Sequence, residues 1–476
     1  MKSKIINQEL LEKIIDEKNI KELRHIFETI PTIDIADAAN EIDDKSKIVF
    51  IFKTVKSEYT ADFFTELSPD TKEELIHMMS DSELAELLEK QFTDDLVDDL
   101  EDLPANLVTR VLKNVSKERR TIINKLLNYK ENTAGSIMTT EFLVLKNTLT
   151  ADEAIKQIRQ IGKSKETIYT LFIIDAQRNL VGTLDLDDLI FSKENILLSD
   201  IMNRDFVTTN VNTDQEEVAN LIKRYDLNAI AVLNNEDRLV GLITVDDIID
   251  VIEQEATEDM SKMAGVAPLE NSYLDTNVFK MSLKCAPWLI CLLILGTFSS
   301  MILNKFESAL TALPILVPFI TVLMDTGGNA GGQTTTLMVR GLAVKEFGPR
   351  DFLKILWKEM RVAIVTGAIV AIVACAWFLL EMYAGIVSFN EFIDGAQLQG
   401  SKLFFGRLEI AALVSATLFL GIIVAKFVGV ALPMFVASIK KDPALISAPF
   451  VTTIVDVCSL LIYIGFAYLV FAQYLS

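Results

Sequence analysis

The feature that most constrains this chain is a set of apolar runs confined to its second half. Residues 285–304 read CAPWLICLLILGTFSSMILN, a stretch without charge. At roughly 20 residues it is long enough to cross a bilayer as a helix. Similar runs follow at residues 309–339, 362–380, 410–438 and 443–476. The sequence therefore predicts an α-helical transmembrane domain of five spans over residues 278–476.

The charge divides the chain at about residue 270. The formal net charge is -21, yet 31 basic and 54 acidic residues precede Asn271, against 14 and 12 from there on. A strongly acidic soluble half repels nucleic acid and attracts cations. We therefore expect cations and membrane lipid as partners, and no nucleic acid.

Cysteine and histidine usage excludes several kinds of site. The four cysteines lie in the apolar half without CxxC spacing, and the chain has two histidines. Neither a disulfide framework nor a zinc site is predicted. No complete phosphate loop or nucleophile–base pair is visible, so an enzyme is the least expected class. The N-terminus reads as an amphipathic helix rather than a signal peptide, which predicts that it stays in the cytosol.

The basic residues near the span ends predict the orientation in the membrane. One side carries Lys280, Lys284, Arg340, Lys345, Arg350, Lys354, Lys358, Arg361, Lys440 and Lys441, and the other Lys305, Lys402 and Arg407. The positive-inside rule then places the soluble half in the cytosol and the C-terminus outside a multi-pass plasma-membrane protein.

Three carboxylates within or beside the apolar runs are candidates for a cation path, because a charge at bilayer depth usually faces water or a partner. They are Asp325, Asp442 and Asp456. In a continuous fifth helix, Asp442 and Asp456 would project from one face, about 21 Å apart. Asp442 before Pro443 also suits a helix N-cap, a role compatible with cation binding. Asp456 suits a packed contact between helices equally well.

The second run contains the glycine-rich stretch MDTGGNAGGQTTT. We expect its glycines to weaken the helix, so that backbone carbonyls and the Asn329 amide face a cavity. The alternative is tight helix packing through small residues. In the fourth run, Lys426 fits a cation path poorly, and it is expected either to face away or to pair with a carboxylate.

An internal repeat precedes the apolar half. SIMTTEFLVLKNTLTADEAIKQIRQI and the following TLFIIDAQRNLVGTLDLDDLI recur as DIMNRDFVTTNVNTDQEEVANLIKRY and AIAVLNNEDRLVGLITVDDII. Each copy predicts a strand, an amphipathic helix, two strands and a second helix. The pattern resembles tandem CBS domains, at residues 131–199 and 200–251. CBS domains often hold adenine nucleotides through a Thr and an Asp three positions later, which implies Thr244 and Asp247 and makes ATP the candidate ligand. The first copy has Asp185 in place of the Thr.

Two acidic segments flank this repeat. Residues 1–130 read as short amphipathic helices of an all-α domain, and their segment FTDDLVDDLEDL carries Asp94, Asp95, Asp98 and Asp99. Such a run is either a cation site or a solvated face. Residues 252–277 continue the helix TVDDIIDVIEQEATEDMSKM toward the membrane. Its like charges destabilise a helix unless cations screen them.

Five motifs carry a resemblance to the MgtE family of magnesium channels and transporters over essentially the whole chain. They are ENTAGSIMTTEF, VNTDQEEVANLIKRYD, TVDDIIDVIEQEATEDM, MDTGGNAGGQTTT and KKDPALISAPFVTTIVDV. The resemblance implies a homodimer with a helical N domain, tandem CBS domains, a connecting plug helix and a five-span pore. It further implies that cytosolic Mg²⁺ bridges carboxylates between domains and holds the pore shut.

The resemblance also implies the Mg²⁺ ligands. Asp442 of the DPA motif is the implied pore ligand. We add Asn329 of the glycine-rich stretch, whose amide is expected to face a cavity, as a second candidate ligand of the pore. The sensor ligands are Asp95, Asp98, Asp99, Glu216, Asp226, Asp247, Glu255, Glu258 and Asp259.

The predicted function is Mg²⁺-selective influx that cytosolic Mg²⁺ shuts off. Mg²⁺ holds its waters tightly, so a pore lined by a few carboxylates and carbonyls can recognise the hydrated ion. One alternative is a nucleotide-regulated divalent-cation carrier or exporter. Another is a membrane-anchored sensor that conducts nothing, against which Asp442 and Asp456 argue.

Overall fold

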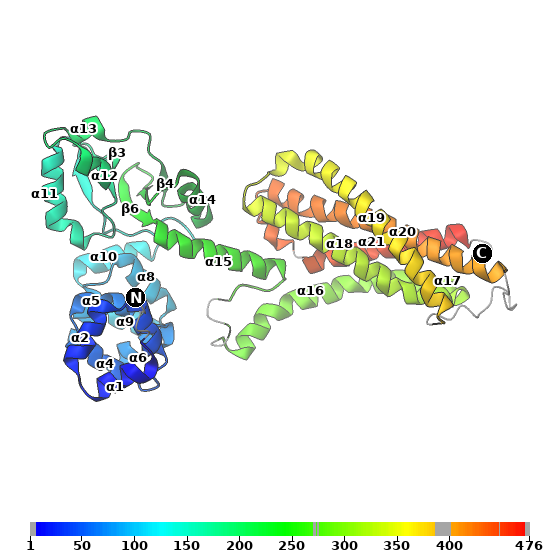
Figure 1. Cartoon of the computed structure of the whole chain (residues 1–476), viewed down its shortest axis with the longest axis horizontal. Helices are drawn as coiled ribbons and strands as arrows, with labels where there is room; N and C mark the ends of the chain where they lie inside the picture. Colours follow the sequence, from blue (N-terminus) through cyan, green and yellow to red (C-terminus); the bar gives the residue numbers. More distant parts are fainter. Residues whose placement is uncertain (1–5, 270–272, 274–275, 386–400, 447, 472–476) are drawn as a thin grey trace. The chain divides into compact units, whose positions relative to one another are not determined.

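The computed structural model describes residues 6–269, 273, 276–385, 401–446 and 448–471 (Figure 1). It divides into two compact units, Met1–Glu253 and Gln254–Ser476, which are described one at a time. Residues 472–476, where the predicted external C-terminus falls, lie outside the described residues. So do parts of the predicted connecting segment 252–277.

The first unit begins with short helices, as the all-α prediction requires. They are α1 Gln8–Asp16, α2 Ile20–Thr29, α3 Thr32–Asn40, α4 Lys45–Thr54, α5 Ser57–Thr65, α6 Pro69–Met78, α7 Asp81–Leu88, α8 Thr93–Asp102, α9 Ala105–Asn114 and α10 Lys117–Leu126. Polar caps set several starts: Ser80 and Glu83 form a capping box at α7. Each helix buries one apolar face, so the stack depends on packing rather than on helix length.

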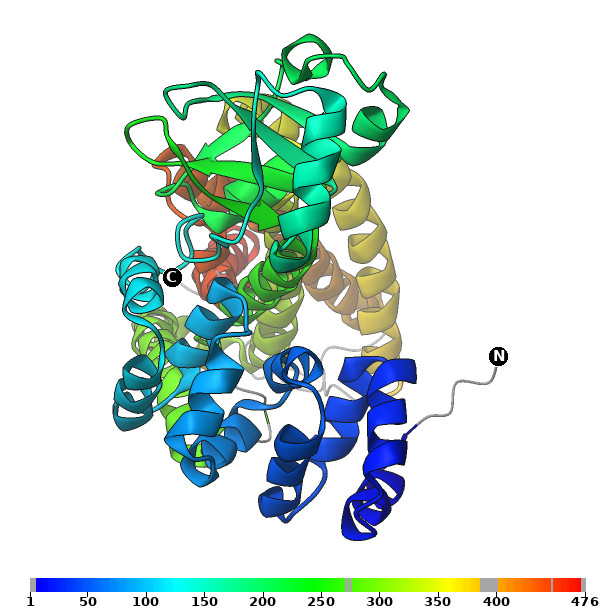
Figure 2. The same ribbon diagram turned by 90° about the vertical axis from the view of Figure 1, so that its left-hand side faces the viewer.

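The repeat folds as predicted, with the same topology in both copies. Its strands are drawn in the upper part of Figure 2. The first copy comprises β1 Val144–Lys146, α11 Ala151–Ile161, η1 Gly162–Ser164, β2 Thr170–Ile174, β3 Leu180–Asp185 and α12 Leu186–Phe191. The second comprises α13 Leu198–Ile201, β4 Thr208–Asn210, α14 Gln215–Tyr225, β5 Ala229–Leu233, β6 Leu239–Thr244 and the start of α15 Val245–Met263. In each three-stranded sheet the first two strands are parallel, and the third is antiparallel to the second.

The N-terminal helices and the second repeat share one apolar core. It contains Val97 of α8 and Leu126 of α10 together with Val218, Ile230 and Ile243 of the second repeat. In Figure 1, α8 and α10 accordingly lie on the side of the helical stack that is nearest the sheets. This shared core brings the acidic helix α8 close to the CBS pair.

Helix α15 crosses the predicted boundary between residues 251 and 252 without interruption and ends at Met263. Gly265 ends it with a φ of +74°, a left-handed conformation that glycine adopts without strain. The Gly265 N–H donates to the Lys262 carbonyl and the Val266 N–H to the Ser261 carbonyl, each at 2.9 Å. The predicted continuation of the helix beyond the second repeat is therefore present as far as Met263, and the bounds 252–277 of the connecting segment stay a prediction.

The second unit consists of long helices. They are α16 Val278–Lys305, α17 Glu307–Ala312, η2 Pro314–Leu316, α18 Val317–Ala343, η3 Pro349–Asp351, α19 Phe352–Tyr383, α20 Ser401–Ser438, η4 Pro443–Leu445 and α21 Ala448–Val470. Helix α18 packs against α20 and α21, while α19 packs against α20 and α16 against α21. Among the described residues, four helices are long and apolar enough to cross a membrane: α16, α19 with η3, α20 and α21. Helix α18 falls outside this group, and its polar glycine-rich stretch accounts for its lower hydropathy.

The glycine-rich stretch does not break its helix. Helix α18 is continuous from Val317 to Ala343, which overturns the prediction of a weakened segment. The glycines allow close packing instead: a Cβ on Gly328 would lie 2.5 Å from Thr452 Cγ2 of α21. At the crossing with α20, a Cβ on Gly429 would lie 2.8 Å from the Gly331 carbonyl oxygen. Small residues here let helix backbones approach, as the alternative reading held.

Candidate cation sites

The first candidate site lies in the first unit, where α8 faces the CBS pair. Asp94 is only 8% exposed, and its Oδ1 has no hydrogen-bond partner among the described residues. Burial raises the pKa of Asp94 well above its usual value, and the charges of Asp95, Glu166 and Asp247 add to this. Burial, with Asp99 and Asp247, raises the pKa of Asp95 to about 7. Carboxylates from three parts of the unit therefore converge here.

Glu166 and Asp247 supply the CBS side of this site. Glu166 lies in the loop before β2, and its Oε2 is buried without a hydrogen-bond partner in the described part of the chain. Burial raises its pKa to about 8, reinforced by Asp247 and Asp95. Asp247 lies in the first turn of α15 and its pKa is also raised by burial. Partly buried acids without matching cations are the arrangement that a hard divalent ion with oxygen ligands stabilises.

The nearby basic groups compensate this charge only in part. Arg119 donates to the backbone carbonyls of Leu88 and Gln91. Lys72 forms an ion pair with Asp99, whose other oxygen accepts a 2.8 Å hydrogen bond from Gln91 Nε2. Asp99, one of the predicted ligands, is thus engaged inside the N-terminal helices, whereas the pKa of Asp95 is raised by burial and then by the charges of Asp99 and of Asp247 in the CBS pair.

The α8 aspartates are not one solvated face. Asp94 and Asp99 are buried, and Asp95 is partly buried. The Asp98 side chain is exposed by area, yet desolvation of its carboxyl, with the charges of Glu101 and Asp95, raises its pKa to about 7, so its ligand role stays a prediction. The sequence motifs favour Asp95, Asp98 and Asp99 as ligands over Asp94 and do not point to Glu166. The pattern of α8 contains a signal for Asp94, because it lies three residues before Val97 and therefore on the apolar face of the helix. Glu166 lies in a loop, where no periodicity marks it.

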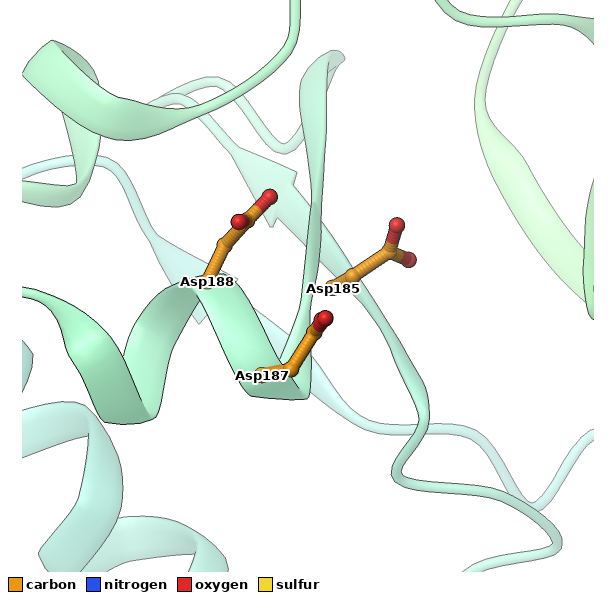
Figure 3. A group of neighbouring side chains, drawn as sticks. All are labelled: Asp185, Asp187 and Asp188. Atoms are coloured by element: carbon orange, nitrogen blue, oxygen red, sulfur yellow. The ribbon is translucent and has the colours of Figure 1, made fainter.

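The two residues predicted to bind a nucleotide, Thr244 and Asp247, are hydrogen-bonded to each other. The Thr244 hydroxyl donates to Asp247 Oδ2 at 2.5 Å, and Thr244 is buried. In the first repeat, Asp185, Asp187 and Asp188 gather where β3 meets α12, all of them exposed (Figure 3). Exposed carboxylates of this kind are usually hydrated, and we assign no site to them. Nucleotide binding at Thr244 and Asp247 stays a prediction.

Two further predicted sensor residues lie apart from each other. Glu216 is in the first turn of α14, and Asp226 caps its C-terminus with a φ of 50°. Both are exposed. Ten residues of helix separate them by about 15 Å, so they do not share one ion within one chain. Their ligand roles stay predictions.

The predicted pore ligand, Asp442, lies in the second unit at a turn between helices. It caps the short helix η4, and its Oδ1 accepts a 2.8 Å hydrogen bond from the Ala444 N–H. Helix α21 begins only at Ala448. The N-cap reading is confirmed. The prediction that Asp442 and Asp456 share one face of a continuous fifth helix is wrong, because the chain turns between them.

The end of α15 contacts Asp442 directly. Lys262 Nζ lies 2.8 Å from Asp442 Oδ2 and 2.7 Å from Glu258 Oε1. Burial acts to lower the Lys262 pKa, but the hydrogen bonds from its ammonium to Asp442 and Glu258 outweigh burial and raise it. Asp259 also lies close, since burial and then the Asp442 charge raise its pKa to about 6. Three of the predicted ligands, Glu258, Asp259 and Asp442, are therefore brought together around one ammonium. Glu255, another predicted ligand, lies one turn earlier on the same helix.

The remaining polar residues of the second unit differ in whether they have a partner within the chain. Asp325 and Asn329 of α18 are exposed within the chain, and Asp456 Oδ1 of α21 is buried with no hydrogen-bond partner in the described residues. Lys426, by contrast, is buried and pairs with Glu359 at 3.4 Å, while donating to Thr334 Oγ1 at 3.1 Å. Of the two readings of Lys426, pairing with a carboxylate is confirmed.

Comparison with known proteins agrees with this layout in each part of the chain. The family described as "Divalent cation transporter" matches residues 320–466, the "MgtE intracellular N domain" matches residues 32–132, and "CBS domain" matches residues 134–194 and 198–254. A Thermus thermophilus protein named "Magnesium transporter MgtE" is 32% identical over 461 residues, covering 96% of this chain and 97% of its own. The chain belongs to the MgtE family of magnesium transporters.

Other relatives extend this family assignment. An Enterococcus faecalis protein of the same name is 35% identical, covering 72% of this chain and 70% of its own. A Bacillus subtilis protein of that name is 29% identical, covering 95% of each chain. A crystal structure of the soluble part of a magnesium transporter superposes with a TM-score of 0.50 at 31% identity, covering 52% of this chain and 98% of its own. The MgtE relatives are named as transporters rather than enzymes, so the chain is a multi-pass membrane protein of magnesium transport.

Proposed function

We propose that this MgtE chain is a Mg²⁺-permeable channel that carries Mg²⁺ into the cell and that cytosolic Mg²⁺ closes. In this proposal Mg²⁺ bridges carboxylates of the N-terminal helices, the CBS pair and the plug part of α15. Falling Mg²⁺ then leaves these like charges uncompensated, and their repulsion favours the open state.

The observation that carries the sensing role is the carboxylate cluster of α8 and the CBS pair. Asp94 and Glu166 both hold a buried oxygen without a hydrogen-bond partner among the described residues. Burying such a group without a partner costs free energy. A divalent ion between Asp94, Asp95, Glu166 and Asp247 would remove this cost, and it would do so only while α8 lies against the CBS pair.

The permeation role rests on Asp442 at the turn before α21. Its position at a span end, between α20 and α21, supports a site for a hydrated ion at the mouth of a path. We propose five spans, with α18 as the span that the polar stretch interrupts, a cytosolic N-terminus and an external C-terminus. We further propose a homodimer, in which two copies of Asp442 and Asn329 flank one path, with ATP as a candidate ligand of the CBS pair.

The test is the Mg²⁺ dependence of closure in a sensor variant. In Asp95→Asn/Asp247→Asn the reconstituted protein should still conduct Mg²⁺, but closure should require about tenfold more cytosolic Mg²⁺, because two bridging ligands are lost. Asp37→Asn, which removes an exposed carboxylate of α3, is the matched control and should close as the unaltered protein does.

Two results would count against the proposal. Closure of the sensor variant at the unaltered Mg²⁺ concentration would remove the sensing role of this cluster. Saturable flux that depends on nucleotide or on a coupled ion, with no unitary currents, would instead favour the alternative, a nucleotide-regulated carrier or exporter.

A further inference from the structure

Both oxygens of the predicted pore carboxylate are already occupied within the chain. Asp442 Oδ1 accepts from the Ala444 N–H at 2.8 Å, and Oδ2 accepts from Lys262 Nζ at 2.8 Å. The first bond is the helix cap and belongs to the local fold. The second comes from a residue 180 positions earlier in the chain. A cation approaching Asp442 in this state therefore meets an ammonium in the place where its own hydration shell would bind.

The ammonium is held in place by its surroundings. Glu258, one helical turn before Lys262, accepts from the same Nζ at 2.7 Å and fixes the side chain against α15. Lys262 also lies in the last turn of α15, where a positive charge suits the helix dipole. Asp259 adds a third carboxylate near Asp442. One ammonium thus lies among three acids, Glu258, Asp259 and Asp442.

The chain that follows α15 anchors this helix end to the first apolar helix. A Cβ on Gly265 would collide with the indole ring of Trp288, so only glycine lets the backbone approach the ring this closely. The Ala267 N–H donates to the Lys284 carbonyl at 3.4 Å, and Lys284 Nζ donates to the Pro268 carbonyl. The Trp288 ring lies 6.3 Å from that of Phe450 in the first turn of α21. The end of α15 is therefore seated beside the start of α21.

Resting on the proposed function, we infer that Lys262 is a tethered cation that competes with Mg²⁺ for Asp442. When the end of α15 is seated, the ammonium occupies the carboxylate and excludes the permeating ion. When α15 withdraws, Lys262 leaves with it and exposes Asp442 to hydrated Mg²⁺. Tethering gives the ammonium a high effective concentration at Asp442, so that a single charge competes with a divalent ion in solution.

The test compares Lys262→Met with Lys262→Arg in the full-length protein reconstituted in bilayers with Mg²⁺ as the sole permeant cation. Methionine keeps much of the length of the side chain and loses its charge, so closure should require about five- to tenfold more cytosolic Mg²⁺. Arginine keeps the charge and should close within about twofold of the unaltered protein. Lys441→Met, which removes an exposed cation directly beside Asp442, is the matched control and should leave closure unchanged.

A second measurement covers the case in which Lys262→Met does not fold. Lys262→Cys is placed in a chain whose four native cysteines are changed to Ser. Modification with an aminoethyl thiosulfonate, which forms a disulfide with the introduced thiol and releases sulfinate, should restore closure. A sulfonatoethyl reagent of similar size should not restore it, and the two results come from one folded sample.

The possible failures are distinct from one another. If Lys262→Met closes at the unaltered Mg²⁺ concentration, or if the restored ammonium has no effect, the tethered-cation role is overturned. If Lys262→Met is folded but silent while the unaltered protein conducts, the role is also overturned, because Lys262 would then support conduction. If the unaltered protein passes no Mg²⁺, or Asp442→Ala conducts as before, the proposed function itself fails.

Discussion

Individual acids in this protein titrate according to where the fold places them. Glu166 has a pKa of about 8 and Asp95 a pKa of about 7, in each case first through burial and then through neighbouring carboxylates. These charges destabilise the arrangement in which α8 lies against the CBS pair. Protonation or a bound divalent ion removes the same repulsion by different means.

A pH dependence follows from these raised values. Where α8 lies against the CBS pair, Glu166 and Asp95 bind protons more tightly than they do when exposed, so the contact weakens as the pH rises from about 5 to about 8. We predict that, without divalent ions, amide protection of α8 corrected for intrinsic exchange falls by about tenfold or more across this range. Millimolar Mg²⁺ should restore it at the upper end of the range.

Hydrogen exchange followed by mass spectrometry of peptides from α8 measures this change. Glu166→Gln serves as the matched variant, because it removes one titrating group while keeping the length of the side chain, and it should flatten the pH dependence. Protection of α8 that rises with pH, or that Mg²⁺ leaves unaltered, would contradict the assignment of this cluster as a sensor.

Among the elements of the second unit, a buried lysine connects three helices through one ion pair and one hydrogen bond. Lys426 of α20 lies between Glu359 of α19 and Thr334 of α18, and Lys426 and Glu359 are both buried. Close by, Gly429 meets the Gly331 backbone of α18. The pair therefore sets how α18, which carries Asp325 and Asn329, lies against its neighbours.

Removing one partner of this pair leaves a buried charge unpaired. Lys426→Met should lower the free energy of unfolding of the second unit by about 3–5 kcal/mol. Lys426→Met together with Glu359→Met should recover most of the loss, because no charge is then left unpaired. Thermal unfolding of the detergent-solubilised protein tests this, and a double variant no more stable than Lys426→Met would show that the pair has another role.

The elements that sequence predicted best are those fixed by local pattern. The repeat of strand, helix, strand, strand and helix follows from the alternation and periodicity of apolar residues, and the structure has it twice. The pairing of Lys426 was foreseen as one alternative, but its partner was not. Glu359 lies in a different helix, 67 residues away, and no local pattern joins the two.

The predictions for α18 and for the start of the last span are wrong. Helix packing determines the conformation of α18, and a proline determines where the last span begins. The glycines of α18 weaken an isolated helix, yet here they bring α18 close to α20 and α21, and the contacts outweigh the intrinsic cost. At the last span, Pro449 carried the missed signal. A helix that began at Pro443 would place Pro449 in its interior at a cost of about 3 kcal/mol, whereas in α21 it falls in the first turn, where proline is tolerated.

In the molecule as a whole, one helix, α15, connects two groups of acids. Asp247 at the start of α15 belongs to the sensor cluster, and Glu258, Asp259 and Lys262 near its end surround Asp442. In the proposed channel, a change in the Mg²⁺ occupancy of the first group acts on the second through α15. The direction of the effect follows from linkage: an ion that binds only one arrangement stabilises that arrangement.

Whether Asp442 lines a cation path is decided by the current that Mg²⁺, as the sole permeant cation, carries through the purified protein in bilayers. It compares the unaltered chain with Asp442→Asn while cytosolic Mg²⁺ is varied. Asparagine caps a helix about as well as aspartate, so this variant removes the charge and keeps the turn before α21. We expect unitary currents that vanish at about millimolar cytosolic Mg²⁺ in the unaltered protein and no currents in the folded variant. Asp442→Asn channels that conduct Mg²⁺ as the unaltered protein does would contradict this expectation.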